Sequence, residues 1–286
     1  MTDMIGQILC GRYQIVAKLG HGGMGVVYLA SDTMLGRQVA IKLLNPKYTS
    51  RVALHRLQRE VQMQAQLEHP NVVRGYDAGH ERTMFFVMEY VERVHFGELL
   101  ASTKLPERLH IIAQACNGLA YAHGRHLIHR DVKPQNVLVS VNSEAKLGDF
   151  GVGRVVEEQS RLTREGMTVG SVHFMAPEQG SGKPVDHRTD LYSVGVMLYL
   201  ASTNRLPFIG RQHEVISQHL HAQPKASRKI DPAIPEELES LICHLLEKKP
   251  DKRPPSAEVV RAELERLHTA YWPIMSEVDP KNWPGG

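Results

Sequence analysis

The sequence predicts an α+β protein with two lobes, a small β-rich lobe followed by a larger helical lobe. Strand-like runs of β-branched and apolar residues crowd the first third of the 286-residue chain. Segments whose apolar residues recur at helical spacing fill the last two thirds. A run of strands followed by a run of helices is typical of the α+β class, and the length suffices for a substantial core.

The composition indicates a globular protein and argues against several functional classes. The net charge is only +3, from 34 basic and 31 acidic residues, so we expect no nucleic-acid partner. The three cysteines are far apart and outside any metal-ligand spacing, which indicates reduced thiols. No apolar run approaches the roughly 18 residues of a membrane span, and the N-terminus lacks a signal-peptide pattern. We therefore expect a cytoplasmic chain without a membrane span.

Glycines interrupt the first strand signal. Strands are expected at 12–19 and 26–30, with Gly20-His21-Gly22-Gly23-Met24-Gly25 as the tip between them. Glycines let a phosphate approach the backbone closely, because no Cβ stands in the way. The pattern also suggests a dinucleotide-binding turn, but that fold needs a helix directly after the glycines, and 26–30 is strand-like. The phosphate-binding P-loop pattern is absent as well.

The rest of the β-rich lobe holds one long polar helix. A short apolar strand ends at Lys42, and an exposed helix is expected over 51–67. Further strand signals lie at 72–73 and 83–90.

A dense polar loop lies at 129–136, after an amphipathic helix predicted for 106–126. It brings Asp131 and Asn136 close together in sequence, and Pro134 argues against a helix continuing through it. His123, His126 and His129 are spaced by three, which suggests a metal site. The i, i+4 spacing of paired helical ligands is absent, however, and His129 falls outside the helix.

A small hairpin over 137–147 leads to Asp149. Together with Asp131 and Asn136, this carboxylate would form an oxygen-rich site suited to Mg²⁺. Residues 152–175 are polar and lack periodicity, which is typical of a functional or disordered loop. The remaining helices are expected at 190–203, 212–222, 235–248 and 256–270, with Ser256 as the cap of the last.

Five motifs in this order resemble the eukaryotic-like (Hanks-type) protein kinases, and within them the bacterial serine/threonine kinases. They are the glycine hairpin, Val39-Ala40-Ile41-Lys42, the loop His129-Arg130-Asp131 with Asn136, Asp149-Phe150-Gly151, and Ala176-Pro177-Glu178. The resemblance implies a kinase domain over 13–268, with an N-lobe of about 13–89, a hinge of about 89–92 and a C-lobe of about 93–268. Residues 1–12 would be an N-terminal extension and 269–286 a tail.

The resemblance implies transfer of the γ-phosphoryl group of ATP to serine and threonine hydroxyls of proteins. Asp131 would be the base and Lys133 would neutralise the transferred group. Lys42, held by Glu60, would orient the phosphates, and Asn136 with Asp149 would hold Mg²⁺ or Mn²⁺. The implied ATP-binding positions, besides Lys42, are Leu19, Gly20, Gly22, Gly23, Gly25, Val27, Ala40, Met88, Glu89, Val91 and Leu138.

The resemblance also implies control by autophosphorylation, for which a homodimer is a possible partner arrangement. Arginine clusters bind phosphate through bidentate, charge-assisted hydrogen bonds. Arg130 would bind a phosphate on Thr163 or Thr168, and Ser171 would contribute to substrate recognition near the base. Arg154 and Arg56 are at other positions that could also bind this phosphate. The alternative is that these arginines are solvated surface charges that bind no phosphate.

Two positions depart from the family pattern. Gln64 and Gly75 stand where the family's internal hydrophobic spine has apolar residues, so we expect the helix that carries Glu60 to be loosely held until phosphorylation or a partner orders it. Two other functions are compatible with the fold. A pseudokinase scaffold would normally lack one of Lys42, Asp131, Asn136 or Asp149, and none is lacking. A small-molecule phosphotransferase would not be expected to carry the family's full activation segment, which the polar residues 152–175 and the closing Ala176-Pro177-Glu178 resemble.

Overall fold

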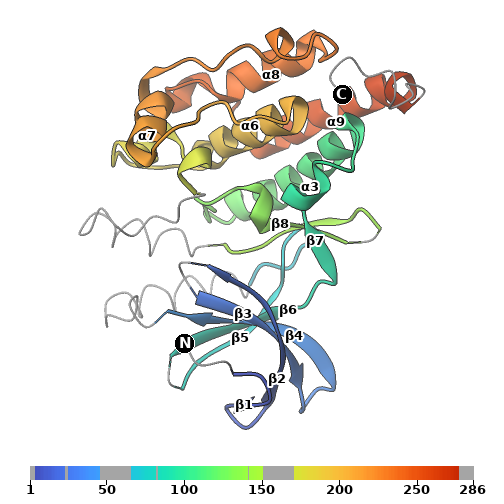
Figure 1. Ribbon diagram of the computed structural model, residues 1–286, viewed down its shortest axis with the longest axis vertical. Coiled ribbons are helices and arrows are strands. Elements are labelled where there is room, and N and C mark those ends of the chain that lie inside the picture. The colour runs from blue at the N-terminus through green and yellow to red at the C-terminus, as the bar shows by residue number, and fades with distance from the viewer. Residues whose placement is uncertain are drawn as a thin grey trace. The chain divides into compact units, whose positions relative to one another are not determined.

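The computed structural model describes residues 4–22, 25–45, 66–81, 83–140, 142–150 and 171–276 (Figure 1). The chain divides into two compact units. The first unit contains residues 1–92 and 149–168, and the second contains residues 93–148 and 169–286. Strands dominate the described part of the first unit and helices that of the second. The α+β class is therefore confirmed.

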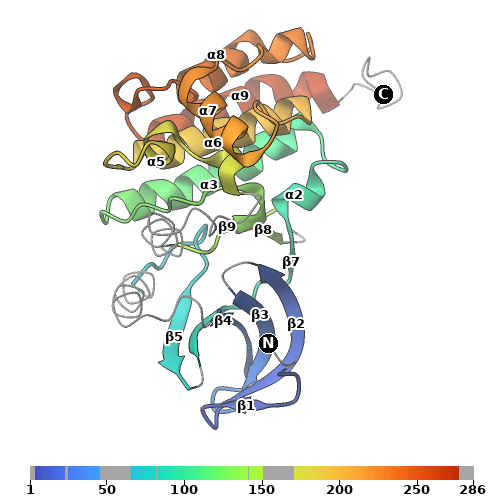
Figure 2. The same ribbon diagram turned by 60° about the vertical axis from the view of Figure 1, so that its left-hand side comes forward.

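The first unit contains an antiparallel sheet of six strands in the order β1-β2-β3-β4-β6-β5. Figure 2 shows the strong curvature of β2, the second strand in this order. The strands are β1 (Ile8–Leu9), β2 (Tyr13–Gly22), β3 (Gly25–Asp32), β4 (Arg37–Leu44), β5 (Gly75–His80) and β6 (Met84–Glu89). Val72 and Val73 are buried but precede β5. Val72 forms only an isolated bridge, and the continuous strand begins at Gly75.

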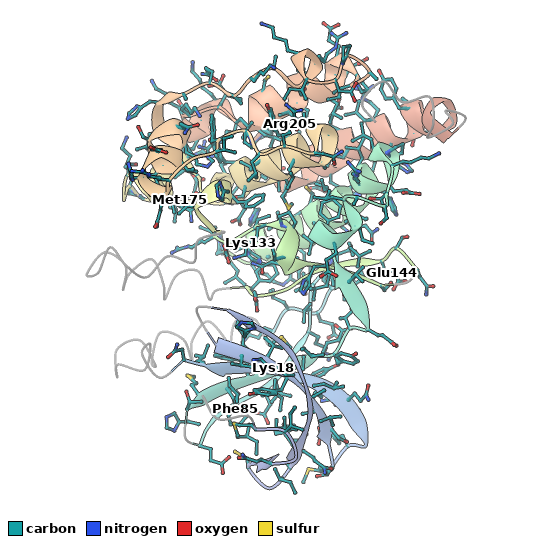
Figure 3. The ribbon with its side chains drawn as sticks, in the orientation of Figure 1. Lys18, Phe85, Lys133, Glu144, Met175 and Arg205 are labelled. Atoms are coloured by element: carbon teal, nitrogen blue, oxygen red, sulfur yellow. The ribbon has the colours of Figure 1, made fainter. Side chains whose placement is uncertain are left out.

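Only one face of this sheet belongs to the hydrophobic core. One face is the core of the unit, and Phe85 is among its largest buried side chains (Figure 3). The other core residues are Leu9, Tyr13, Ile15, Tyr28, Ala30, Val39, Ile41, Leu43 and Val87. Side chains alternate between the faces of a strand, so the residues between these core positions point to the opposite face. Val27, Lys42 and Phe86 lie opposite one another across β3, β4 and β6, and Ala40 lies opposite Met88.

The second unit is built around a buried central helix, α6 (Arg188–Thr203), which packs against α3 (Leu105–His123) and α8 (Glu236–Leu245). In turn α9 (Ala257–Ser276) packs along α3. A three-stranded sheet consists of β7 (Arg93–His95), β8 (Val137–Ser140) and β9 (Ala145–Leu147). The shorter elements are α2 (Phe96–Leu99), η2 (Pro134–Asn136), η3 (Ser171–Phe174), α5 (Pro177–Gly180), α7 (Gln212–His221), η4 (Ser227–Lys229) and η5 (Pro250–Lys252).

The long helices begin within two residues of their predicted starts, but α9 ends at Ser276, six residues beyond its predicted end at 270. Ser256 caps α9, because the amide of Val259 donates to Ser256 Oγ at 3.3 Å. The short elements β1, β7 and α2 were not predicted, since two to four residues are too few to show a periodicity. Within the described part of the chain, no helix is long and apolar enough to cross a membrane.

Candidate active site

The glycines at the β2–β3 turn differ in what surrounds them. A Cβ added at Gly20 or Gly22 would meet nothing within 4 Å. A Cβ at Gly25 would lie 1.9 Å from the carbonyl oxygen of Leu43 on the neighbouring strand β4. Gly20 and Gly22 therefore leave the room that a phosphate would need, whereas Gly25 is required by the close approach of two strands. Gly23 lies outside the described residues.

Lys42 forms an ion pair within the first unit. Its Nζ lies 2.8 Å from Asp149 Oδ1, and its side chain is 8% exposed against 35% for that of Asp149. Asp149 has a φ of 60°, which is uncommon for a residue other than glycine. The predicted partner of Lys42, Glu60, lies outside the described residues, as do Gln64 and Arg56. The second departure from the family pattern, Gly75, is the first residue of β5 and pairs with Met88.

Several of the predicted ATP-binding residues of the first unit lie on one face of its sheet. Val27, Ala40 and Met88 share a face with Lys42, and Leu19 on β2 is 39% exposed. The amide of Glu89 donates to the carbonyl of Arg74 at 2.9 Å. Of the two backbone groups of Glu89, the carbonyl is therefore the one that adenine could use. The last two positions are buried, Val91 in the first unit and Leu138 on β8 of the second.

Asp131 is surrounded by the other polar residues of its loop. Lys133 donates from Nζ to Asp131 Oδ2 at 2.7 Å, and Lys133 is labelled in Figure 3. Asn136 donates from Nδ2 to the Asp131 backbone oxygen at 2.7 Å and to Oδ2 at 3.2 Å. Pro134 begins the 3₁₀ turn η2, which returns Asn136 towards Asp131. The carboxylate thus has a fixed orientation and a cation beside it.

A fully buried histidine, His129, connects this loop to the end of β9. Its Nε2 donates to the carbonyl of Gly148 at 2.7 Å, and its Nδ1 accepts from the amide of Asp131 at 3.2 Å. These two partners require the tautomer with the proton on Nε2. Gly148 in turn donates its amide to the Asn136 carbonyl at 2.9 Å.

Asp190, at the start of α6, holds the backbone of the same loop. Its carboxylate is fully buried and accepts from the amides of His129 at 2.9 Å and Arg130 at 2.7 Å. It also lies 2.8 Å from Nε2 of His123. Burial by itself would raise the pKa of Asp190, but the hydrogen bond from His123 and the nearby imidazoles lower it below its ordinary value.

Arg130 is held on its other side by Gln179 of α5. Gln179 donates from Nε2 to the Arg130 carbonyl at 2.9 Å, and its Oε1 accepts from the amide of Ala176 at 3.0 Å. Arg130 has a φ of 67°, so two side chains stabilise an uncommon backbone conformation. The predicted regulatory residues Arg154, Thr163 and Thr168, and the side chain of Ser171, lie outside the described part of the structure.

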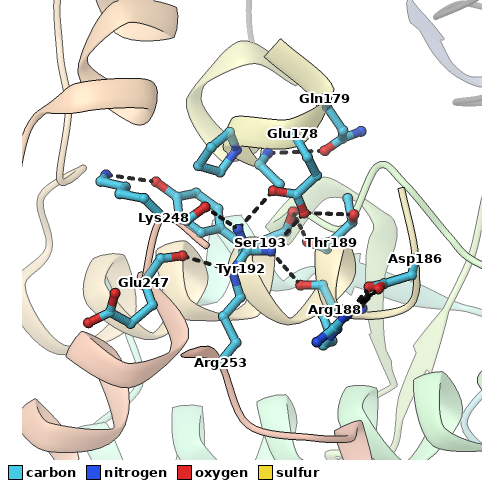
Figure 4. A network of polar contacts seen from close by, with 12 residues as sticks. Glu178, Gln179, Asp186, Arg188, Thr189, Tyr192, Ser193, Glu247, Lys248 and Arg253 are labelled. Atoms are coloured by element: carbon cyan, nitrogen blue, oxygen red, sulfur yellow. Dashed lines mark hydrogen bonds and ion pairs between the residues drawn. The ribbon is translucent and has the colours of Figure 1, made fainter. Parts of the chain in front are cut away.

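A buried ion pair ties the end of the predicted activation segment to the loop before α9 (Figure 4). Arg253 donates to both carboxylate oxygens of Glu178, at 2.7 and 2.8 Å. Thr189 Oγ1 donates to Glu178 at 2.8 Å, so the carboxylate has a third partner. The guanidinium also donates to the backbone oxygens of Glu247 and Arg188, both at 2.8 Å. Such a pair compensates both buried charges.

The supporting residues Asp190, Gln179 and Arg253 were not predicted from the sequence. The available signal was an acidic residue, Asp190, at the start of an otherwise apolar, buried helix. The spacing of His123, His126 and His129 does not indicate a metal site, because His123 contacts Asp190 and His129 contacts Gly148. No group of three or more histidine, cysteine, aspartate or glutamate side chains that could hold a metal occurs among the described residues.

A β-sheet unit that presents a buried lysine, joined to a helical unit with a polar Asp-Lys-Asn loop, defines the class of the protein kinases. The family model for the protein kinase domain matches residues 13–264. The chain belongs to this family, and within it resembles the bacterial serine/threonine kinases of the eukaryotic-like type.

Two curated relatives illustrate this. The chain is 35% identical to the serine/threonine-protein kinase PrkC of Bacillus subtilis, covering 93% of this chain and 42% of PrkC. It is 36% identical to the serine/threonine-protein kinase PknB of Mycolicibacterium smegmatis, covering 95% of this chain and 45% of PknB. The chain thus spans less than half the length of these relatives.

A solved structure supports the bilobal kinase fold. The crystal structure of a mutant of the Mycobacterium tuberculosis PknI kinase domain matches with a TM-score of 0.76 at 25% identity. The match covers 93% of this chain and 99% of the PknI chain.

Proposed function

We propose that this chain is an ATP-dependent serine/threonine protein kinase. The observation that carries the proposal is the arrangement around Asp131, whose carboxylate is held by Lys133 at 2.7 Å and by Asn136 at 3.2 Å. A carboxylate in a fixed orientation, with a lysine beside it, suits proton acceptance from a hydroxyl during phosphoryl transfer. The serine/threonine kinases among the relatives support the same activity.

In this proposal the substrate hydroxyl oxygen attacks the γ-phosphorus of ATP as the bond to the β–γ bridging oxygen breaks. Asp131 accepts the hydroxyl proton, and ADP leaves with the bridging oxygen. Lys133 offsets the negative charge of the transferred group, which requires positioning more than covalent chemistry from the protein. The specificity for serine and threonine rests on the resemblance at Lys133.

The residues present also suit a divalent cation, with Mg²⁺ as the expected ion and Mn²⁺ as a possible substitute. Asp149 and Asn136 carry the oxygen ligands that Mg²⁺ prefers. The cation would supply positive charge to the phosphates of ATP. Lys42 would add to that charge from its buried position on β4, where the ion pair with Asp149 holds its ammonium group in place.

A comparison of the unaltered chain with Asp131→Asn tests the proposal. We expect the unaltered chain to transfer label from γ-labelled ATP to serine or threonine of a generic protein substrate, and Asp131→Asn to lose the transfer. Equal thermal unfolding of the two proteins would show that the loss is chemical. Binding of ATP without transfer by the unaltered chain would instead indicate a pseudokinase scaffold.

We further propose that autophosphorylation of Thr163 or Thr168 regulates the enzyme, with Arg130 binding the phosphate. The reaction would take place in a homodimer. The protein substrates would be in the cytoplasm. The clamped backbone of Arg130 supports its part in this proposal. Peptide mass mapping after incubation with ATP tests it. A fully active enzyme with neither threonine phosphorylated would contradict the proposal.

A further inference from the structure

A buried histidine of the second unit, His219 on α7, takes no part in the kinase chemistry proposed above. The residue is 1% exposed. Its ring packs edge-on against the rings of Tyr192 and Phe208, with centroid distances of 5.6 and 4.9 Å. The Tyr192 hydroxyl lies 2.9 Å from Nδ1 of His219. Buried polar atoms are almost always hydrogen-bonded, so the second ring nitrogen, Nε2, should have a partner as well.

The neighbours of His219 determine which nitrogen carries the proton. Its pKa is lowered to about 4, by burial first and by the charge of Lys248 second, so near neutral pH the ring is uncharged and has a single N–H group. Lys248 donates from Nζ to the Tyr192 hydroxyl oxygen at 3.4 Å (Figure 4). A lysine can only donate, so the hydroxyl proton of Tyr192 is left for Nδ1 of His219. The proton of the ring is therefore on Nε2.

This N–H group faces η3, the segment that packs against both α6 and α7. Within the described part of the chain, Nε2 of His219 is buried and makes no hydrogen bond of ordinary geometry. Against the larger effects of burial and Lys248, the backbones of His173 and Val172 raise the pKa of His219, so their carbonyls lie close to the ring. A small shift of η3 towards α7 would pair this buried donor and remove the cost of leaving it unpaired.

The η3 segment also lies beside the proposed base. From α6, Ser193 donates its hydroxyl to the Phe174 carbonyl at 2.7 Å. The chain then continues into α5, where Gln179 donates to the carbonyl of Arg130, the residue before Asp131. A protein that presents a hydroxyl to Asp131 therefore brings its neighbouring residues close to this part of the chain. None of the predicted ATP-binding residues is in η3.

We propose that His219 is a positioning residue for protein substrates, which donates from Nε2 to the backbone of η3 when a substrate is bound. The proposal rests on the kinase activity proposed above. The hydrogen bond would fix η3 where it receives the residues next to the phosphorylated hydroxyl, and so increase the affinity for the protein substrate. ATP binding and the chemical step should not depend on it, because Asp190 and Gln179 hold the loop of Asp131 by separate hydrogen bonds.

Steady-state kinetics near neutral pH, with dephosphorylated casein as the protein substrate, test the proposal. His219→Gln keeps an amide donor near the place of Nε2, whereas His219→Asn keeps polar atoms only near the place of Nδ1. We expect His219→Asn to raise the KM of casein about fivefold to tenfold, the effect of one lost hydrogen bond, with kcat and the KM of ATP within about twofold. His219→Gln should retain the KM of the unaltered chain. The control is His221→Asn, which alters an exposed residue at the end of the same helix and should change none of these constants.

NMR of the chain with nitrogen-15 in its histidines gives a measurement that does not depend on the activity of a variant. The signal of His219 is the one of 16 that the variants remove. We expect casein without ATP to shift its Nε2 signal in the direction of a hydrogen-bonded N–H group, and ATP alone to leave it unchanged.

The outcomes separate this proposal from the proposed function. Equal KM values of casein for the unaltered chain and His219→Asn would overturn the role of His219 while the kinase activity stands, and so would an Nε2 signal that casein does not shift. An equal rise in KM for His219→Asn and His219→Gln would also overturn it, because Nε2 would then not be the donor. The absence of any transfer by the unaltered chain would overturn the kinase activity and this proposal together.

Discussion

Arg253 and Glu178 form a bidentate ion pair in which the Arg253 side chain is 0% and the Glu178 side chain 4% exposed. The pair joins α5 to the turn before α9, elements 75 residues apart in sequence. Removing two charges from water is costly, and the cost is offset here because both groups have several hydrogen-bond partners. The pair therefore stabilises the position of α5 only while both members are present.

We expect Arg253→Met to lower the free energy of unfolding by about 3 to 5 kcal/mol, because it leaves the Glu178 carboxylate buried without its cation. Urea unfolding followed by circular dichroism measures the change. The matched control is Arg266→Met, which breaks an exposed pair with Glu263 and should cost far less, because solvent screens the two charges. Equal losses in the two variants would contradict a special role for the buried pair.

Asp190→Asn should reduce kcat about 100-fold with little change in the KM of ATP. The new carboxamide would have to point its N–H₂ donor at one of the two backbone amides that now donate to the Asp190 carboxylate. Two donors facing each other would displace the loop that carries Asp131. Small displacements of a catalytic group reduce the rate by a factor of this size. Steady-state kinetics of phosphoryl transfer give both constants.

The control for that variant is Asp186→Asn, which alters a half-exposed carboxylate paired with Arg188 and should leave kcat unchanged. If kcat of Asp190→Asn stays within about twofold of the unaltered enzyme, a factor worth only about 0.4 kcal/mol, the hydrogen bonds of Asp190 do not position the loop.

The stability of the protein should fall as the pH drops from about 6.5 to about 4, and His219 is one cause. Burial, followed by the charge of Lys248, lowers the pKa of His219 to about 4 from its ordinary value of 6.5. Between these values the unfolded chain binds a proton at this histidine that the folded chain does not, so acid favours unfolding. The pKa difference corresponds to about 3 kcal/mol, all of it lost below about pH 4.

Urea unfolding across this pH range measures the effect. His219→Gln should flatten the pH dependence, whereas exposed His221→Gln should leave it unchanged. If the unaltered protein and His219→Gln lose stability in parallel between pH 6.5 and 4, the titration of His219 does not contribute.

Gly25→Ala should destabilise the first unit by about 1 to 3 kcal/mol, the range for overpacked sites. The added methyl group would meet the Leu43 carbonyl oxygen at 1.9 Å, which only a separation of β3 from β4 can relieve. Differential scanning calorimetry measures the shift. Gly20→Ala is the control, since its Cβ enters open space and should cost well under 1 kcal/mol. Similar shifts for both variants would count against the close approach of the strands.

The sequence predicted the architecture and the polar loop because both have local signals. Apolar periodicity located α3, α6, α7, α8 and α9, and the cluster around Asp131 is contained in eight residues. The contacts of Asp190, Gln179 and Arg253 were not predictable in the same way. Their partners lie 49 to 75 residues away, and only the packing of α5 and α6 brings them together.

The backbone conformation and surroundings of single residues could not be predicted from the sequence either. The positive φ of Arg130 and Asp149 has no signal in the sequence, since arginine rarely adopts it and no glycine marks the position. The glycine pattern did indicate the β2–β3 turn, but it could not distinguish Gly20, which faces open space, from Gly25, which contacts Leu43.

The hydrogen bonds of His129 determine how much of this protein would have to be transplanted to move its polar loop to another scaffold. His129 spans the Asp131 amide and the Gly148 carbonyl, while Asp190 holds the backbone of His129 from α6. A graft of residues 129–136 alone would carry the carboxylate without the groups that orient it. The smallest portable unit extends through the β8–β9 hairpin and includes the first turn of α6.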